Sequence, residues 1–261
     1  MTRLRARGVT VDLGGRAALD GFDLDAGAGE VVGLIGANGA GKSTALKAMA
    51  RLLRRRAGEV RLDDRPIERF GARELARRLA YLPQGHQVNW PMSVERLVGL
   101  GRLPWRGPFA GPSAADAIAV ADAMERADVS HFAGRAATEL SGGERARAAL
   151  ARALAVEAEI LFADEPVASL DPYHQLQVME LLRGAAGDGT LVIVVLHDLT
   201  LASRFCDRLV LLAEGRLVAE GAPSEVLAPE RLAQAYGVEG FVGEHDAERF
   251  VLPWRRLARS G

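Results

Sequence analysis

The feature that most constrains the fold is the glycine-rich stretch GANGAGKST at residues 36–44. It has the spacing G-x-x-x-x-G-K-[ST] and lies between the apolar run VVGLI and the helix-favouring stretch STALKAMARLLRR. A strand, a glycine-rich turn and a helix start in this order bind phosphate, because backbone N–H groups and the positive end of the helix point at the anion. We therefore expect a phosphate-binding loop made of Gly36, Ala37, Asn38, Gly39, Ala40, Gly41, Lys42, Ser43 and Thr44.

Two of these side chains have expected roles of their own. Lys42 neutralises the β- and γ-phosphates of a nucleotide, and the Ser43 hydroxyl is a ligand for Mg²⁺. The alternative is a chance glycine-rich turn, which the strand-to-helix setting disfavours.

A second stretch, ILFADEP at 160–166, is an apolar run that ends in two carboxylates. The carboxyl end of a buried strand is where α/β sheets bind ligands. There Asp164 would hold Mg²⁺ through its water shell, and Glu165 would orient or deprotonate an attacking water. Alone, this pattern is typical of a solvated strand end, and only the phosphate-binding loop makes the catalytic interpretation the better one.

A third stretch, LSGGERARAALARALA at 140–155, predicts a helix with Ser141 as N-cap and Gly142 and Gly143 in its first turn. Such a helix start can bind an anion. By itself it would be an ordinary capped helix.

Together, GANGAGKST, LSGGE and ILFADEP resemble the motifs of the ATP-binding cassette (ABC) family, the ATPase subunits of ATP-driven transporters, in that family's order. The resemblance covers nearly the whole chain. It implies that ATP binds with Mg²⁺ and that two copies pair head to tail. The ATP of one copy would then also contact Ser141, Gly142 and Gly143 of the other.

The resemblance extends to smaller motifs. Gln84 in YLPQ matches the glutamine that reaches Mg²⁺ and the attacking water, and Asp171 in ASLD matches the carboxylate of the loop that crosses the dimer interface. His197 matches the switch histidine, which donates a hydrogen bond to the γ-phosphate. Taken singly, these would be a turn residue, a helix cap and a structural histidine. Leu13 stands where the family usually has an aromatic residue against adenine, so we expect only an apolar contact there.

The composition excludes several other classes of protein. The 261 residues include 33 Lys and Arg and 34 Asp and Glu, so a net charge of −1 gives no reason to expect nucleic-acid binding. With Cys206 as the only cysteine, no intrachain disulfide can form. The longest apolar runs are far shorter than the roughly 20 residues that span a bilayer, and the N-terminus lacks the pattern of a signal peptide. We therefore expect a soluble, cytoplasmic chain.

The order of patterns predicts an α/β fold: a P-loop ATPase core with an antiparallel β subdomain over residues 1–30 and an inserted helical subdomain. The helical subdomain covers about 85–155. We expect one ATPase domain over 1–236 and a C-terminal tail over 237–261. The tail contains three basic residues, Arg255, Arg256 and Arg259, which we expect to be solvated and not in contact with lipid headgroups.

Within the family, the stretches SVERLVGLGRLPW and LHDLTLASRF resemble the branch that serves importers of ferric siderophores, haem and cobalamin. This implies two membrane-spanning permease subunits as partners, a substrate-binding protein outside the cell, and a peripheral position on the inner face of the membrane. Segment 85–112, with Trp90 and Trp105, is the candidate docking surface, since aromatic residues suit the core of an interface. Core packing of these tryptophans is the equal alternative.

Other function classes fit less well. The alternatives are an ABC ATPase for another cargo and a non-transport ABC ATPase of DNA repair or chromosome structure. About one hundred residues separate GANGAGKST from LSGGE. This is too few for the long coiled coil that non-transport ABC ATPases carry between the two halves of the site. A P-loop kinase would explain GANGAGKST but not LSGGE.

Overall fold

The computed structural model describes residues 2–85, 90–246 and 248–257, and no helix in these ranges is long and apolar enough to span a bilayer. The strands are β1 (Arg3–Leu13), β2 (Arg16–Gly27), β3 (Val31–Ile35), β4 (Ala57–Leu62), β5 (Arg65–Pro66), β6 (Leu79–Leu82), β7 (Ile160–Asp164), β8 (Leu191–Val195), β9 (Arg208–Ala213), β10 (Arg216–Gly221), β11 (Val238–His245) and β12 (Glu248–Arg256). The α-helices are α1 (Lys42–Met49), α2 (Ala72–Arg78), α3 (Val94–Gly99), α4 (Ala114–Arg126), α5 (Gly142–Leu154), α6 (Pro172–Gly187), α7 (Leu199–Phe205), α8 (Pro223–Val226) and α9 (Pro229–Tyr236). The short 3₁₀ helices are η1 (Ile67–Arg69), η2 (Leu100–Trp105), η3 (Ser130–Phe132) and η4 (Ala137–Glu139).

The central sheet has the strand order β10-β9-β3-β8-β7-β6. Its strands are parallel except β10, which pairs antiparallel with β9. All residues of β3, β7 and β8 are buried. This explains their uninterrupted apolar sequences, because a parallel sheet is covered on both faces.

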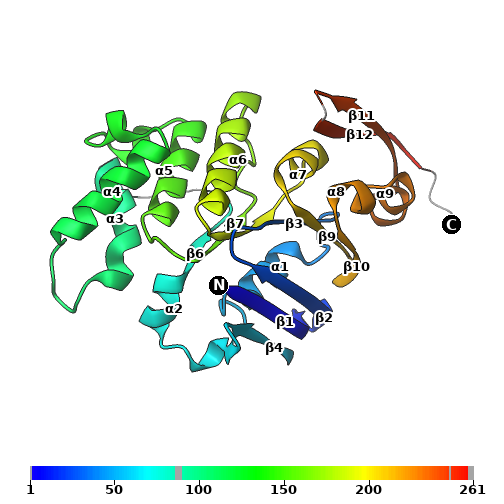
Figure 1. Ribbon diagram of the computed structural model, residues 1–261, viewed down its shortest axis with the longest axis horizontal. Coiled ribbons are helices and arrows are strands. Elements are labelled where there is room, and N and C mark those ends of the chain that lie inside the picture. The colour runs from blue at the N-terminus through cyan, green and yellow to red at the C-terminus, as the bar shows by residue number, and fades with distance from the viewer. Residues whose placement is uncertain (1, 86–89, 247, 258–261) are drawn as a thin grey trace.

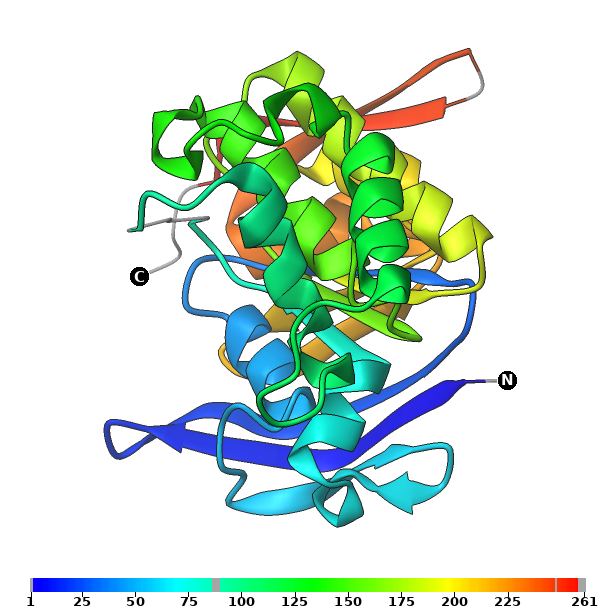
Figure 2. The same ribbon diagram turned by 90° about the vertical axis from the view of Figure 1, so that its left-hand side faces the viewer.

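A second, antiparallel sheet of order β2-β1-β4-β5 lies beneath the central sheet (Figures 1 and 2). Helix α1 lies between the two sheets, and its apolar residues share one core with both of them. Helices α5, α6 and α7 contribute to the core on the other face of the central sheet. The β1–β2 pair confirms the antiparallel start expected for residues 1–30.

Helices α3, α4 and α5 form an arm at one end of the molecule, with an apolar cluster of their own (Figure 1). Ser93, Ser113 and Ser141 cap these three helices by accepting a bond from the backbone N–H three residues later. The arm falls between β6 and β7, which are neighbours in the sheet, so the helices interrupt the sequence but not the sheet.

One expectation about a helix is wrong. The sequence predicts a helix through Arg55, but α1 ends at Met49. Arg51 has a left-handed φ of 58°, which ends the helix, and its guanidinium donates to the carbonyl oxygens of Ile67 (3.1 Å) and Phe70 (2.7 Å). Long-range contacts therefore outweigh the helix propensity of RLLRR.

The C-terminal segment is folded where the sequence predicts a tail. Strands β11 and β12 form a hairpin in which Val238 pairs with Arg256, and Val251 is buried in the main core. Arg255 and Arg256 are exposed on β12, in agreement with the solvated side chains expected there. Arg259 lies outside the described residues.

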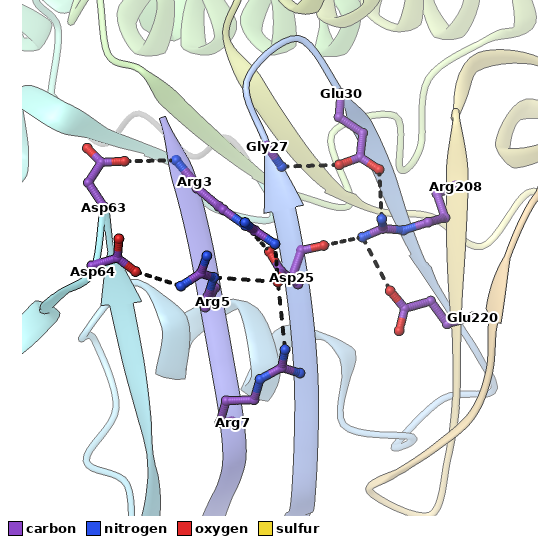
Figure 3. Close-up of polar contacts among 10 residues, drawn as sticks. All are labelled: Arg3, Arg5, Arg7, Asp25, Gly27, Glu30, Asp63, Asp64, Arg208 and Glu220. Atoms are coloured by element: carbon purple, nitrogen blue, oxygen red, sulfur yellow. Dashed lines mark hydrogen bonds and ion pairs between the residues drawn. The ribbon is translucent and has the colours of Figure 1, made fainter. Parts of the chain in front are cut away.

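The exposed face of the antiparallel sheet carries an ion network (Figure 3). Asp25 on β2 pairs with Arg3 at 2.6 Å, Arg5 at 3.5 Å and Arg7 at 3.7 Å, and the hydrogen bond from Arg3 lowers the pKa of this carboxyl. Arg208 on β9 donates to the backbone oxygen of Asp25 at 2.6 Å. This contact joins the antiparallel sheet to the central one, whereas the exposed pairs themselves contribute little to stability.

Candidate nucleotide site

The glycine-rich loop connects β3 to α1, as the sequence predicts. Gly36 has φ 146°, and a Cβ there would lie 2.2 Å from the Leu212 carbonyl oxygen. Gly41 has φ 101°, and a Cβ would lie 2.7 Å from the Ala18 oxygen. Both positions need glycine because the backbone conformation and the neighbouring chain leave no room for a side chain.

Lys42 is buried at the start of α1. Its Nζ donates to the carbonyl oxygens of Gly36 (2.8 Å) and Ala37 (3.0 Å). Burial lowers the pKa of Lys42, and the nearby carboxylates of Glu165 and Asp164 oppose this effect. The ammonium group is therefore held inside the loop, where a phosphate could replace its carbonyl partners.

Asp164 is 1 % exposed at the end of β7 and has three partners. It accepts a hydrogen bond from the Ser43 hydroxyl on Oδ1 (2.7 Å) and from the Tyr81 hydroxyl on Oδ2 (2.9 Å). Lys47 Nζ lies 3.8 Å from Oδ2. Desolvation raises the pKa of Tyr81, so its hydroxyl stays protonated and remains a donor.

Tyr81 and Lys47 are neighbours of this carboxylate that the sequence motifs do not indicate. Lys47 follows Ser43 by four residues, one turn of α1, and so lies on the same side of the helix. Tyr81 lies on β6, which is adjacent to β7. The period of the helix could have predicted that Lys47 lies near Ser43 and this carboxylate. The position of Tyr81 could be predicted only by knowing that β6 and β7 are neighbours in the sheet.

Glu165 lies between two side chains from the segments that follow β6 and β8. Its Oε2 accepts a hydrogen bond from Gln84 Nε2 at 2.6 Å, and its Oε1 lies 2.7 Å from His197 Nε2. The backbone of Glu165 has a left-handed φ of 52°, an uncommon conformation for this residue type. The structure thus brings together three residues that are 81 and 32 positions apart in sequence, and it fixes both carboxylate oxygens.

These residues line one cleft of about 850 Å³. Leu13 and Ala18 from the antiparallel sheet form an apolar part of its wall. The remaining lining residues are Asn38, Gly39, Ala40, Gly41, Lys42, Ser43, Thr44, Gln84, Glu165 and His197.

Ser141, Gly142 and Gly143 do not belong to this cleft's lining. Ser141 caps α5: its Oγ accepts from the Glu144 N–H at 3.3 Å, and Glu144 Oε2 accepts from the Ser141 N–H at 2.7 Å. Within one chain the LSGGE helix start is thus separate from the phosphate-binding loop. It contributes no residue to the lining of the cleft in its own chain.

Asp171 caps α6 and lies close to the LSGGE helix start. It accepts a hydrogen bond from the His174 N–H at 3.0 Å and lies 2.8 Å from His174 Nδ1. These hydrogen bonds lower the pKa of Asp171. The His174 ring lies against Gly143, since a Cβ there would come within 2.8 Å of it. His174, which belongs to neither motif, connects the two motifs expected to face a second copy.

The site combines the parts that phosphoryl transfer to water requires. The loop offers amides and a buried cation for phosphates, Asp164 and Ser43 offer oxygen ligands, and Glu165 offers a fixed carboxylate that can accept a proton from water. Gln84 and His197 hold that carboxylate at the edge of the cleft.

The comparisons with known proteins agree with this geometry. Residues 19–168 match the family model described as ABC transporter. The hemin import ATP-binding protein HmuV of Streptomyces coelicolor is 48 % identical over 96 % of this chain and 89 % of its own length. The protein of the same name in Bordetella parapertussis is 42 % identical over 97 % of this chain and 98 % of its own length.

Solved structures give the same result for the fold. The chain superposes on a chain from an inward-facing conformation of a metal-chelate type ABC transporter with a TM-score of 0.85 at 23 % identity, over 100 % of this chain and 99 % of that one. A dimeric ATP-binding cassette bound to ADP and phosphate matches with a TM-score of 0.73 at 28 % identity, over 84 % of this chain and 98 % of that one. This protein belongs to the ABC transporter family and is an ATP-binding, ATP-hydrolysing transport subunit.

Proposed function

We propose that this chain is the ATPase subunit of a hemin importer, in which ATP binding closes a head-to-tail pair of subunits and hydrolysis reopens it. The observation that supports hydrolysis here is the fixed Glu165 carboxylate, which has Gln84 and His197 on its two oxygens and Lys42 in the same cleft. The cargo rests on the similarity to relatives named for hemin import. Ferric siderophores and cobalamin are the alternatives that the experiment below must separate from it.

Magnesium is the metal that these residues fit. Ser43 Oγ and Asp164 Oδ1 are already within 2.7 Å of each other, and both are hard oxygen ligands of the kind that Mg²⁺ prefers together with phosphate oxygens. Gln84 supplies a further amide oxygen at the edge of the cleft. Bound there, Mg²⁺ would neutralise charge on the phosphates.

We further propose that His197, whose Nε2 now lies 2.7 Å from Glu165 Oε1, donates a hydrogen bond to the γ-phosphate when ATP is bound. This role predicts a specific kinetic defect. His197→Ala should lower kcat for ATP by roughly tenfold to 100-fold and change KM little, because a donor aimed at developing charge acts mainly in the transition state. Steady-state phosphate release at several ATP concentrations measures both. A parent-like kcat would return His197 to a structural role.

The proposed pairing places Ser141, Gly142 and Gly143 of one subunit on the ATP of the other, with Asp171 at the interface. Two observations support this pairing. The capped start of α5 is separate from the cleft of its own chain, and His174 contacts both Gly143 and Asp171.

The partners in the membrane are proposed to be two permease subunits, with a substrate-binding protein that delivers cargo from outside the cell. The described part of segment 85–112 supports a docking surface. Trp90 is 72 % exposed, so core packing is excluded for it. Trp105 is partly covered, because its indole N–H donates to the Val156 oxygen at 2.9 Å and Arg77 and Arg102 lie over its ring.

A substitution of Trp90 therefore tests the docking proposal more directly than one of Trp105. Trp90→Ala should weaken co-purification with the permease by roughly tenfold, because exposed tryptophans are frequent hot spots of interfaces. ATP binding by the isolated subunit should not change. Ile118→Ala removes another exposed apolar side chain, from the outer side of α4, and is the matched control. Equal losses for both variants would contradict a docking role specific to Trp90.

We also propose the domain limits. One ATPase domain covers 1–236 with the helical insertion at about 85–155, and a C-terminal segment covers 237–261. The subunit would lie peripherally on the inner face of the membrane, held by the permease.

Uptake by cells tests the proposed cargo. The gene is deleted from its host, and uptake of labelled hemin, ferric siderophores and cobalamin is measured with and without the restored gene. We expect only hemin uptake to fall, and we expect the restored gene to recover it. A selective loss of another cargo would replace hemin with that molecule, and undiminished uptake of all three would contradict the importer assignment.

A further inference from the structure

The C-terminal hairpin packs directly on the short helix that follows His197. Strand β12 lies along α7 (Figure 1). Helix α7 has only seven residues and begins just after His197 and its N-cap, Asp198, whose carboxylate accepts from the Leu201 N–H at 2.9 Å. Any shift of this helix would therefore move the histidine that contacts Glu165.

Two contacts fasten the hairpin to α7. The Thr200 hydroxyl donates to the Val251 carbonyl oxygen at 3.0 Å and accepts from the Val251 N–H at 3.2 Å. Arg204 pairs with Glu248 at 2.5 Å. Thr200 and Arg204 are four residues apart and so lie on one face of the helix.

The remaining sides of α7 face the protein core. Leu199, Leu201 and Ala202 are buried in the same apolar cluster as Val251. The helix is thus enclosed between the central core and the hairpin, and Thr200 is the residue of the hairpin-facing side that lies nearest in sequence to His197. A single hydroxyl satisfies both backbone groups of Val251, so its loss leaves a part-buried N–H and C=O without their partner.

We propose that the C-terminal hairpin is a positioning element of the ATPase site, acting through Thr200 and α7 to hold His197 against Glu165. This inference rests on the role proposed for His197. Thr200 is a positioning residue, since it does not line the cleft and its hydroxyl bonds the backbone of Val251.

The test removes only the hydroxyl. Thr200→Val keeps the shape of the side chain and should lower kcat for ATP by roughly threefold to tenfold with little change in KM, the size expected when coupling passes through packed elements. Thr200→Ser retains the hydroxyl and should stay within about twofold of the parent. Ser203→Ala removes a hydroxyl from the same helix that has no hairpin partner among the described residues, and it is the matched control.

A double-mutant cycle with His197→Ala separates positioning from general damage. If the hairpin acts through His197, Thr200→Val should slow hydrolysis in the parent but not further in the His197→Ala background. An equal fold-loss in both backgrounds, or a parent-like Thr200→Val, would overturn the inference. A parent chain without ATPase activity would instead contradict the proposed function itself.

Discussion

Glu165→Gln is expected to bind ATP normally and to hydrolyse it about 10²- to 10⁴-fold more slowly than the parent, the range for loss of a general base. The amide keeps the size of the side chain and can still contact Gln84 and His197, but it cannot accept a proton from water. Because ATP persists, the closed pair of subunits should accumulate. Phosphate release measures the rate, and light scattering with ATP measures the pairing.

The control for this variant is Glu180→Gln, which makes the same chemical change on the exposed side of α6. It should hydrolyse ATP like the parent. If Glu165→Gln did the same, Glu165 would not be the group that activates water, and the assignment of the carboxylate at the end of β7 would have to change.

Lys42→Ala is expected to weaken ATP binding by roughly 100-fold to 1,000-fold, because it removes a buried cation that would pair with phosphate. The change also leaves the carbonyl oxygens of Gly36 and Ala37 without the donor they now share. Equilibrium dialysis with labelled ATP measures the affinity.

Lys47→Ala is the natural control, since Lys42 and Lys47 are the only two lysines of the chain. Lys47 lies 3.8 Å from Asp164 and does not line the cleft, so its loss should weaken binding by less than about tenfold. Similar losses for the two lysines would indicate a general charge effect. It would contradict a specific role for Lys42 in the loop.

The sequence predicted those parts of the fold and site that depend on neighbours in the chain. The loop, its flanking strand and the cap at Ser141 follow from local chemistry: glycine where φ is positive, an apolar run where the sheet is covered, and a hydroxyl where a helix begins. The strand-end position of Asp164 and Glu165 has the same origin. The family resemblance supplied Gln84, Asp171 and His197, whose own neighbours would not have identified them.

What the sequence could not predict depends on strand order and long-range contact. Tyr81 reaches Asp164 only because β6 lies beside β7. The early end of α1 depends on carbonyl groups near residue 70, and the C-terminal hairpin depends on a helix fifty residues before it. The spacing of apolar residues along the chain and the composition do not specify which distant segments contact one another.

The most direct test of the central claim, that ATP is hydrolysed at a site shared by two copies, is a crystal structure of Glu165→Gln with ATP and Mg²⁺. The proposed function predicts two chains related by a twofold axis. Each ATP should then lie between Lys42 and Ser43 of one chain and Ser141 and Gly143 of the other, with the metal at Ser43. An ATP molecule enclosed by one chain, with the α5 start of the second chain far from its phosphates, would contradict it.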